Sequence, residues 1–152
     1  MQGGLLRLAT MLSVCTIGVP TAGLEMSLAG CWTNELGSIM WIKVSDSGVI
    51  DGTYNSSVST VRKAADGVVI GYQQSVTNAT FGFVVKWAIG SVTVWAGQYY
   101  NDGAKEQLKT MWLLRKNRQD PKDNWEATLA GMDVFTRANP AKCNVRDDRS
   151  EL

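Results

Sequence analysis

Eight short segments of alternating apolar and polar residues, separated by turn residues, constrain the fold of this chain more than any other feature. In chain order they are Leu28–Asn34, Ser38–Val44, Ile50–Val58, Val68–Gln73, Phe81–Ile89, Val92–Tyr100, Leu108–Arg115 and Glu126–Arg137. A period of two is typical of β-strands, and the links are rich in Gly, Asn, Asp and Ser. Sequential antiparallel strands avoid exposed edges by closing. We therefore predict an all-β, eight-stranded antiparallel up-and-down β-barrel, with an open sandwich as the alternative.

The length and the N-terminal composition set the domain organisation. A chain of 152 residues corresponds to one domain. The segment 1–23 has Arg7 before an apolar run through Val19 and small residues at its end, which is typical of a secretory signal peptide. A disordered or core-packed N-terminus is the alternative. We expect a barrel domain over 24–137, a tail over 138–152, no membrane helix and a secreted, extracellular protein.

Charge and residue types disfavour several function classes. The formal net charge is +1 and no basic stripe stands out, so the sequence gives no electrostatic case for nucleic acid. The chain has no histidine, which leaves little from which to build a metal site or a catalytic base. We therefore expect neither a metal nor a cofactor, and we do not expect an enzyme. Sequons at Asn55 and Asn78 predict a glycoprotein, with Asn78 the better acceptor because it lies in an expected loop.

Three cysteines leave the redox state open. Cys15 lies in the expected signal peptide, so Cys31 and Cys143 would remain in the mature chain. In an oxidising compartment two thiols can pair. An intrachain bridge, an interchain bridge and two free thiols are all compatible with these positions.

Polar residues gather inside the predicted barrel at one end. In a meander, the turns after the first, third, fifth and seventh strands share one mouth. The alternation places these residues near that mouth or across it: Asn34, Ser38, Ser56, Ser59, Thr60, Trp87, Ser91, Thr93, Trp95, Leu114 and Trp125. Deeper on the same interior lie Tyr54, Trp112 and Asp133. A purely structural core would hold branched aliphatics, and buried polar groups without partners cost about 1 to 3 kcal/mol each, so this interior predicts a small bifunctional ligand.

Each of these residues also has a purely structural interpretation. The tryptophans could fill the barrel, as Trp32 is expected to do, and Asp133 could accept a hydrogen bond from a backbone group. Asn34 and Ser38 flank a tight turn and could cap it. What favours a binding pocket is that these residue types occur together, all at inward-facing strand positions and all at one end of the barrel.

The last two strands are apolar on both faces. In Leu108–Arg115 one face carries Trp112 and Leu114 while the other carries Met111 and Leu113. A small antiparallel sheet normally exposes one face to water, so this pattern indicates a core on one side and another subunit on the other.

Six motifs extend these predictions by resemblance. CWTNELGS (31–38), DGTYNSSVS (51–59), TFGFVVKW (80–87), TVWAGQY (93–99), KTMWLLR (109–115) and NWEATLAGMDVFTR (124–137) resemble those of the avidin and streptavidin family, in family order and with short gaps. The resemblance implies an avidin/streptavidin-like barrel and a high-affinity biotin-binding protein. It also implies a homotetramer in which Trp125 caps a neighbouring subunit's pocket.

The resemblance assigns a role to each pocket residue. Asn34, Ser38 and Tyr54 would donate to the ureido oxygen of biotin, and Asp133 and Ser56 would accept from its two N–H groups. Thr93 would contact the sulphur, and Trp87, Trp95 and Trp112 would wall the rings. Leu114, which the alternation places on the same interior, completes the predicted biotin-binding set. Ser91, with Ser59 and Thr60, would lie at the carboxylate end. A lipocalin-like carrier of another small hydrophobic ligand is the alternative, because Gly30-Cys31-Trp32 also resembles the start of that family.

Overall fold

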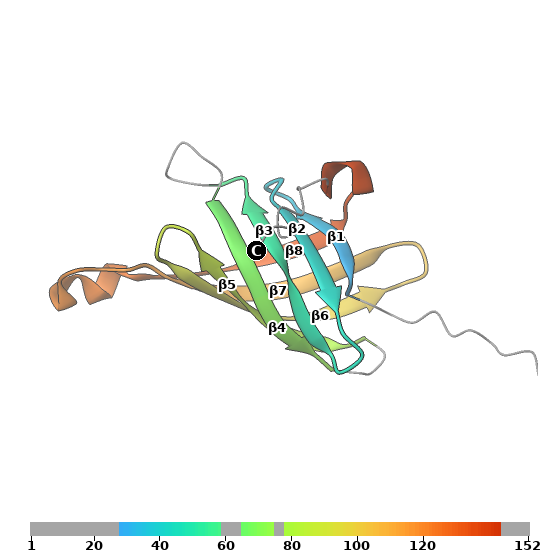
Figure 1. The fold of residues 1–152 in the computed structure, drawn as a ribbon, viewed down its shortest axis with the longest axis horizontal. Helices are drawn as coiled ribbons and strands as arrows, with labels where there is room; N and C mark the ends of the chain where they lie inside the picture. Colours follow the sequence, from blue (N-terminus) through green and yellow to red (C-terminus); the bar gives the residue numbers. More distant parts are fainter. Residues whose placement is uncertain (1–27, 59–64, 75–77, 144–152) are drawn as a thin grey trace, which may run out of the picture.

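The computed structural model describes residues 28–58, 65–74 and 78–143, and in them the chain closes into a barrel of eight antiparallel strands (Figure 1). The strands are β1 (Gly30–Asn34), β2 (Ile39–Val44), β3 (Val49–Ser56), β4 (Ala65–Gln73), β5 (Thr80–Trp87), β6 (Val92–Asn101), β7 (Glu106–Arg115) and β8 (Thr128–Arg137). Each strand pairs with its neighbour in sequence, and β1 also pairs with β8. The predicted closed barrel is confirmed, and the open sandwich is wrong because no edge is left between the first and last strands.

The observed strand bounds lie within a few residues of the predicted segments, with one informative difference. The last strand begins at Thr128 rather than Glu126, because Pro121–Glu126 forms a short 3-10 helix, η1. The Asp120 side chain accepts a hydrogen bond from the backbone N–H of Lys122 and so caps that helix. Figure 1 shows the β7–β8 hairpin, with η1 at its tip, projecting beyond the body of the barrel.

One end of the barrel is filled by apolar side chains. Trp32, Tyr99 and Leu108 are almost fully buried there, and the ring centroids of Trp32 and Tyr99 lie 6.3 Å apart in an edge-on arrangement. The Arg137 guanidinium lies over the Trp32 ring at 4.0 Å and forms an ion pair with Glu106 at 2.8 Å. This hydrogen-bonded ion pair lowers the pKa of Glu106. Packed side chains therefore fill this end of the barrel interior.

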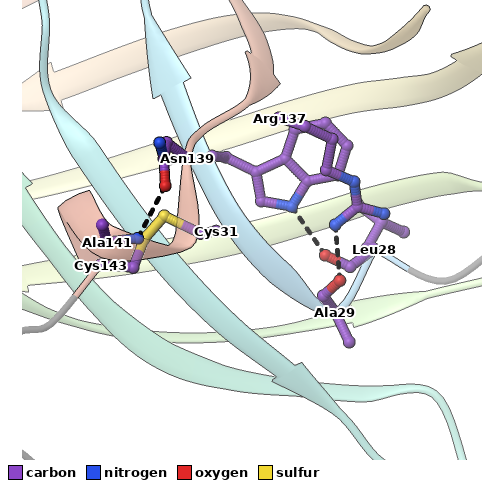
Figure 2. The surroundings of a disulfide bond; sticks show 8 residues. Leu28, Ala29, Cys31, Arg137, Asn139, Ala141 and Cys143 are labelled. Carbon is purple, nitrogen blue, oxygen red and sulfur yellow. Dashed lines mark hydrogen bonds between the residues drawn. A yellow bond between two sulfur atoms is a disulfide. The ribbon is translucent and has the colours of Figure 1, made fainter.

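An intrachain disulfide joins Cys31 in β1 to Cys143 in a second 3-10 helix, η2 (Pro140–Cys143), across a Cα–Cα distance of 6.0 Å. Of the three states that the sequence left open, the structure has the intrachain bridge. Figure 2 shows this bond beside the start of β1, where Arg137 also donates a hydrogen bond to the carbonyl of Ala29. The C-terminal segment is thus held to the first strand, while residues 1–27 and 144–152, with the expected signal peptide and the end of the tail, lie outside the described residues.

The outside of the barrel carries a continuous apolar surface over β4 to β8. Strand register places two adjacent rows on it: Ile70, Val84, Val94, Leu113 and Ala130, and Tyr72, Gly82, Ala96, Met111 and Met132. Met111 is 67% exposed and Met132 is 73% exposed. We call these ten residues the outer apolar face. Neither row contains a charged residue, and apolar patches of this extent are typical of protein interfaces.

No helix within the described residues is long and apolar enough to cross a membrane.

Candidate functional site

A cavity of about 460 Å³ opens at the barrel end formed by the turns after β1, β3, β5 and β7. Ten of the residues predicted from the sequence line it: Asn34, Tyr54, Ser56, Trp87, Ser91, Thr93, Trp95, Trp112, Leu114 and Asp133. They come from six different strands or from the turns beside them. Its volume lies within the range of small-molecule sites in proteins.

Four predicted residues do not line this cavity. Ser38 is almost fully buried next to the cavity-lining Tyr54, with which it is hydrogen-bonded, and its hydroxyl accepts a hydrogen bond from the backbone N–H of Ser57 at 3.1 Å. Trp125 lies on η1 and is 81% exposed, and it is not among the described residues that line the cavity. Ser59 and Thr60 lie outside the described residues.

The mouth includes residues that sequence reasoning did not select. They are Leu36, Val58, Ile89, Lys116, Asn117, Arg118 and Leu129. Most lie in turns, where strand parity carries no information. Two residues are different. Lys116 continues the inward series of Trp112 and Leu114 by one step beyond the end of β7, and Leu129 lies within β8 on the same face as Asp133. The alternation of inward and outward side chains could have identified both.

Asp133 is the acceptor deep in the cavity. Its Oδ1 accepts from Asn34 Nδ2 and its Oδ2 accepts from Trp95 Nε1, each at 3.4 Å. Burial raises the pKa of Asp133, and the charge of Glu35 acts in the same direction, whereas the hydrogen bonds from Trp95 and Asn34 lower it. Both bonds are long for a carboxylate acceptor, so Asp133 keeps the capacity to accept stronger bonds from a ligand.

Asn34 performs two tasks at once. Its Oδ1 accepts a hydrogen bond from the backbone N–H of Ser38 at 2.9 Å, which is the turn-capping role considered from the sequence. Because that bond fixes the amide, Nδ2 is directed into the cavity toward the Tyr54 hydroxyl at 3.5 Å and toward Asp133. The tight turn also needs Gly37, whose φ is +82°. The structural and the functional interpretations of Asn34 are therefore compatible.

Tyr54 presents its hydroxyl next to Asn34 and is held by neighbouring rings. Its ring stacks on Trp95 with centroids 5.4 Å apart and meets Trp87 edge-on at 5.3 Å. Burial raises the pKa of Tyr54 well above its usual value, while a hydrogen bond with Ser38 acts in the opposite direction. The phenol therefore keeps its proton at neutral pH and can donate it to a ligand oxygen.

The indole walls are fixed by local contacts. Trp87 Nε1 donates to Thr93 Oγ1 at 2.7 Å, and Trp95 stacks on Phe83 with centroids 5.2 Å apart. Trp112 lies against Gly131 so closely that a Cβ on this glycine would stand 2.4 Å from the indole. The missing side chain of Gly131 is thus what allows the Trp112 ring to approach β8 so closely. These restraints keep the aromatic surfaces in place without a ligand.

The polar and aromatic groups of this site form a binding surface for a small molecule. Donors from Tyr54 and Asn34 meet the acceptor Asp133 at depth, and indoles enclose the space above them. Within the described residues, no group of three or more His, Cys, Asp or Glu side chains could hold a metal ion.

Comparison with known proteins identifies the family. The model of the avidin family matches residues 22–138. The chain belongs to the avidin family. Avidin of Gallus gallus is 40% identical over 144 residues, covering 90% of this avidin-family chain and 95% of its own length.

Solved structures of avidin-family proteins have the same fold. The crystal structure of Xenavidin is 42% identical and superimposes with a TM-score of 0.69, over 75% of this chain and 99% of its own. The X-ray structure of a biotin binding protein from chicken is 38% identical, with a TM-score of 0.69, over 76% of this chain and 98% of its own. The avidin-like barrel expected from the sequence motifs is thereby confirmed.

Proposed function

We propose that this protein binds biotin in the barrel cavity and sequesters it without chemical turnover. The observation that carries the proposal is the meeting of Tyr54 and Asn34 with Asp133 deep in one aromatic cavity. A cyclic urea offers one strong acceptor oxygen between two N–H donors, which is the complement of this arrangement. The similarity to a chicken protein described as biotin binding supports the same ligand.

The ureido oxygen would receive hydrogen bonds from Asn34, Ser38 and Tyr54. Three convergent donors draw negative charge onto the oxygen, in the way an oxyanion hole acts on a carbonyl. Tyr54 is well suited because its raised pKa keeps the phenolic proton in place. Ser38 would contribute through its hydroxyl, which already interacts with Tyr54.

The two ureido N–H groups would donate to Asp133 and Ser56. The Ser56 hydroxyl donates its own proton to the carbonyl of Val58 at 3.1 Å, so its oxygen is left to accept. Asp133 in its ionised form makes the stronger acceptor. Thr93 would contact the ligand's sulphur, the three indoles and Leu114 would enclose its rings, and Ser91 would meet its carboxylate.

We extend the proposal to a homotetramer. The outer apolar face offers a surface that a second copy of this chain would bury. The projecting β7–β8 hairpin carries the exposed Trp125 ring, which would close the cavity of a neighbouring subunit (Figure 1).

Secretion is part of the same proposal. The Cys31–Cys143 disulfide supports an oxidising compartment, as does the leader-like segment 1–23. Asn78 is exposed in the turn before β5 and would be the glycosylated asparagine. Asn55 lies within β3, and its amide donates to Asp66 at 2.7 Å.

A thermal-shift experiment tests the choice of ligand. Because a ligand that binds only the folded state stabilises it, biotin should raise Tm strongly, while retinol and a fatty acid should leave it unchanged. A shift with retinol or the fatty acid and none with biotin would instead support the lipocalin-like alternative.

A further inference from the structure

The mouth of the cavity carries a cation that no role described above uses. Lys116 lines the cavity together with Asn117 and Arg118, and it is half-buried rather than extended into solvent. Its backbone N–H donates to the carbonyl of Ala127 at 2.7 Å, so the β7–β8 ladder continues through this residue. The lysine is therefore held by strand geometry and not by a free loop.

The alternation of side chains along β7 places Lys116 on the inward side, at the mouth of the cavity. The inward side chains of β7 are Thr110, Trp112 and Leu114, and Lys116 is the next residue in that series. Thr110 pairs with Asp133 across β7 and β8. Lys116 therefore lies six residues further along the chain, toward the mouth, than the residue opposite Asp133. At about 3.3 Å per residue, the two backbone levels are about 20 Å apart. A flexible four-carbon stem lets the ammonium group reach back toward the end of a ligand tail.

The two cations at the mouth differ in their partners. Arg118 forms an ion pair with Glu126 at 3.0 Å, which offsets its charge. Within the described part of the chain, the Lys116 ammonium has no ion pair or hydrogen bond of its own. Among the described residues that line the cavity, Lys116 is thus a positive charge without an ion-pair partner.

We infer that Lys116 is a specificity-determining residue that favours ligands ending in a free carboxylate over the corresponding neutral amides. This inference rests on the proposed function and deepens it. An acceptor carboxylate at the floor and an ammonium group at the mouth fit a ligand that has N–H donors at one end and an anion at the other. A charge-assisted hydrogen bond at a partly desolvated mouth is stronger than the neutral contacts that Ser91 can make.

The test is direct competition between biotin and biotinamide, which has the same shape without the charge. The relative affinity for acid over amide should fall about three- to tenfold in Lys116→Gln. Lys116→Arg should retain the preference and Lys116→Glu should lower it further. Lys43→Gln removes the same charge from the outside of β2, away from the cavity, and should leave the ratio unchanged. Raising the salt concentration should reduce the ratio for the wild type but not for Lys116→Gln.

The outcomes separate this inference from the proposed function. If the wild type binds biotin while Lys116→Gln and Lys116→Glu leave the acid-to-amide ratio unchanged, the role of Lys116 is wrong and the biotin proposal stands. If the wild type binds neither ligand, the first titration rejects the proposed function and the inference together.

Discussion

The indole N–H of Trp95 donates to Asp133 Oδ2 at 3.4 Å, while Asn34 holds the other oxygen of the same carboxylate at the same distance. Asp133 is therefore oriented from both sides by residues of the barrel interior, yet neither bond is short. A preoriented carboxylate with weak partners is suited to exchange them for a ligand's donors. The predictions begin from this residue.

Replacing Asp133 should remove the strongest acceptor of the site. In Asp133→Ala the ligand N–H is buried without a partner, so biotin binding should weaken by about 2 to 5 kcal/mol. Asp133→Asn preserves the shape of the side chain and loses its charge, so its biotin affinity should lie between those of the wild type and Asp133→Ala. Isothermal titration calorimetry measures this order. Equal affinities in all three proteins would reject the role of Asp133.

The raised pKa of Asp133 also sets a pH dependence. Burial favours the protonated form in the free protein, whereas ligand N–H donors favour the ionised form, so binding releases a proton. Biotin affinity should fall as pH drops through the raised pKa of Asp133. The stability of the ligand-free protein changes with pH in the opposite direction. Its free energy of unfolding falls as pH rises from the unfolded-state pKa of Asp133 to the folded-state pKa, because the buried carboxyl must then ionise. Affinity measured across pH should lose this dependence in Asp133→Asn.

Tyr54→Phe tests the donor side of the site. The ring would keep its stacking on Trp95, so Tm without ligand should change little, but the ureido oxygen would lose one donor. We expect biotin to bind about 1 to 3 kcal/mol more weakly. Ser47→Ala, in an exposed turn, is the control. If Tyr54→Phe binds biotin as tightly as Ser47→Ala does, Tyr54 does not donate to the ureido oxygen.

The outer apolar face predicts the effect of a charge on assembly. Met111 and Met132 pair across β7 and β8, and Met111→Lys would place an ammonium group in the centre of the proposed subunit contact. Light scattering after size exclusion should give a tetramer for the wild type and a smaller species for Met111→Lys. Ser47→Lys adds the same charge away from this face and should stay tetrameric. A wild-type monomer at micromolar concentration would reject the tetramer and the Trp125 lid together.

Trp125→Ala tests whether Trp125 closes the cavity of a neighbouring subunit, because its effect on biotin release should then require the tetramer. If the ring closes a neighbour's cavity, its loss should speed biotin release from the tetramer. The same substitution in the Met111→Lys background should have little effect on release, since no neighbouring cavity is present. Dissociation rates of labelled biotin measure both. An equal effect in both backgrounds would mean that Trp125 acts on its own chain.

The Cys31–Cys143 bond predicts a stability change separate from binding. It closes a loop with a sequence separation of 112 residues, so in the chain-entropy model its loss costs about 2 to 5 kcal/mol. Cys143→Ser should lower Tm and leave biotin affinity nearly unchanged, because the bond lies outside the cavity. Reduction of the wild type should reproduce the shift, and reduction of the variant should add nothing.

Much of the fold could be predicted because strand alternation reports directly which side chains face inward. The positions of Asn34, Tyr54, Trp95, Trp112 and Asp133 on one interior follow from that count once the barrel closes. Closure itself is favoured over an open sandwich because a closed meander leaves no exposed edge strand.

Other features lay beyond this kind of reasoning. The partner of Cys31 could not be predicted, since two cysteines far apart in sequence give no pattern. Strand alternation predicts only a link between Arg115 and Glu126, where the structure has the helix η1, although Asp120 followed by Pro121 is a typical helix start. Leu36 and Asn117 reach the mouth from turns, where only the folded chain places them.

A titration of the wild-type protein with biotin, followed by tryptophan fluorescence, tests the central claim most directly. Because Trp87, Trp95 and Trp112 line the cavity, filling it should change their emission, with saturation at one biotin per chain. Asp133→Ala should show the same end point at a higher biotin concentration. An unchanged spectrum, with no heat of binding by calorimetry, would contradict the account.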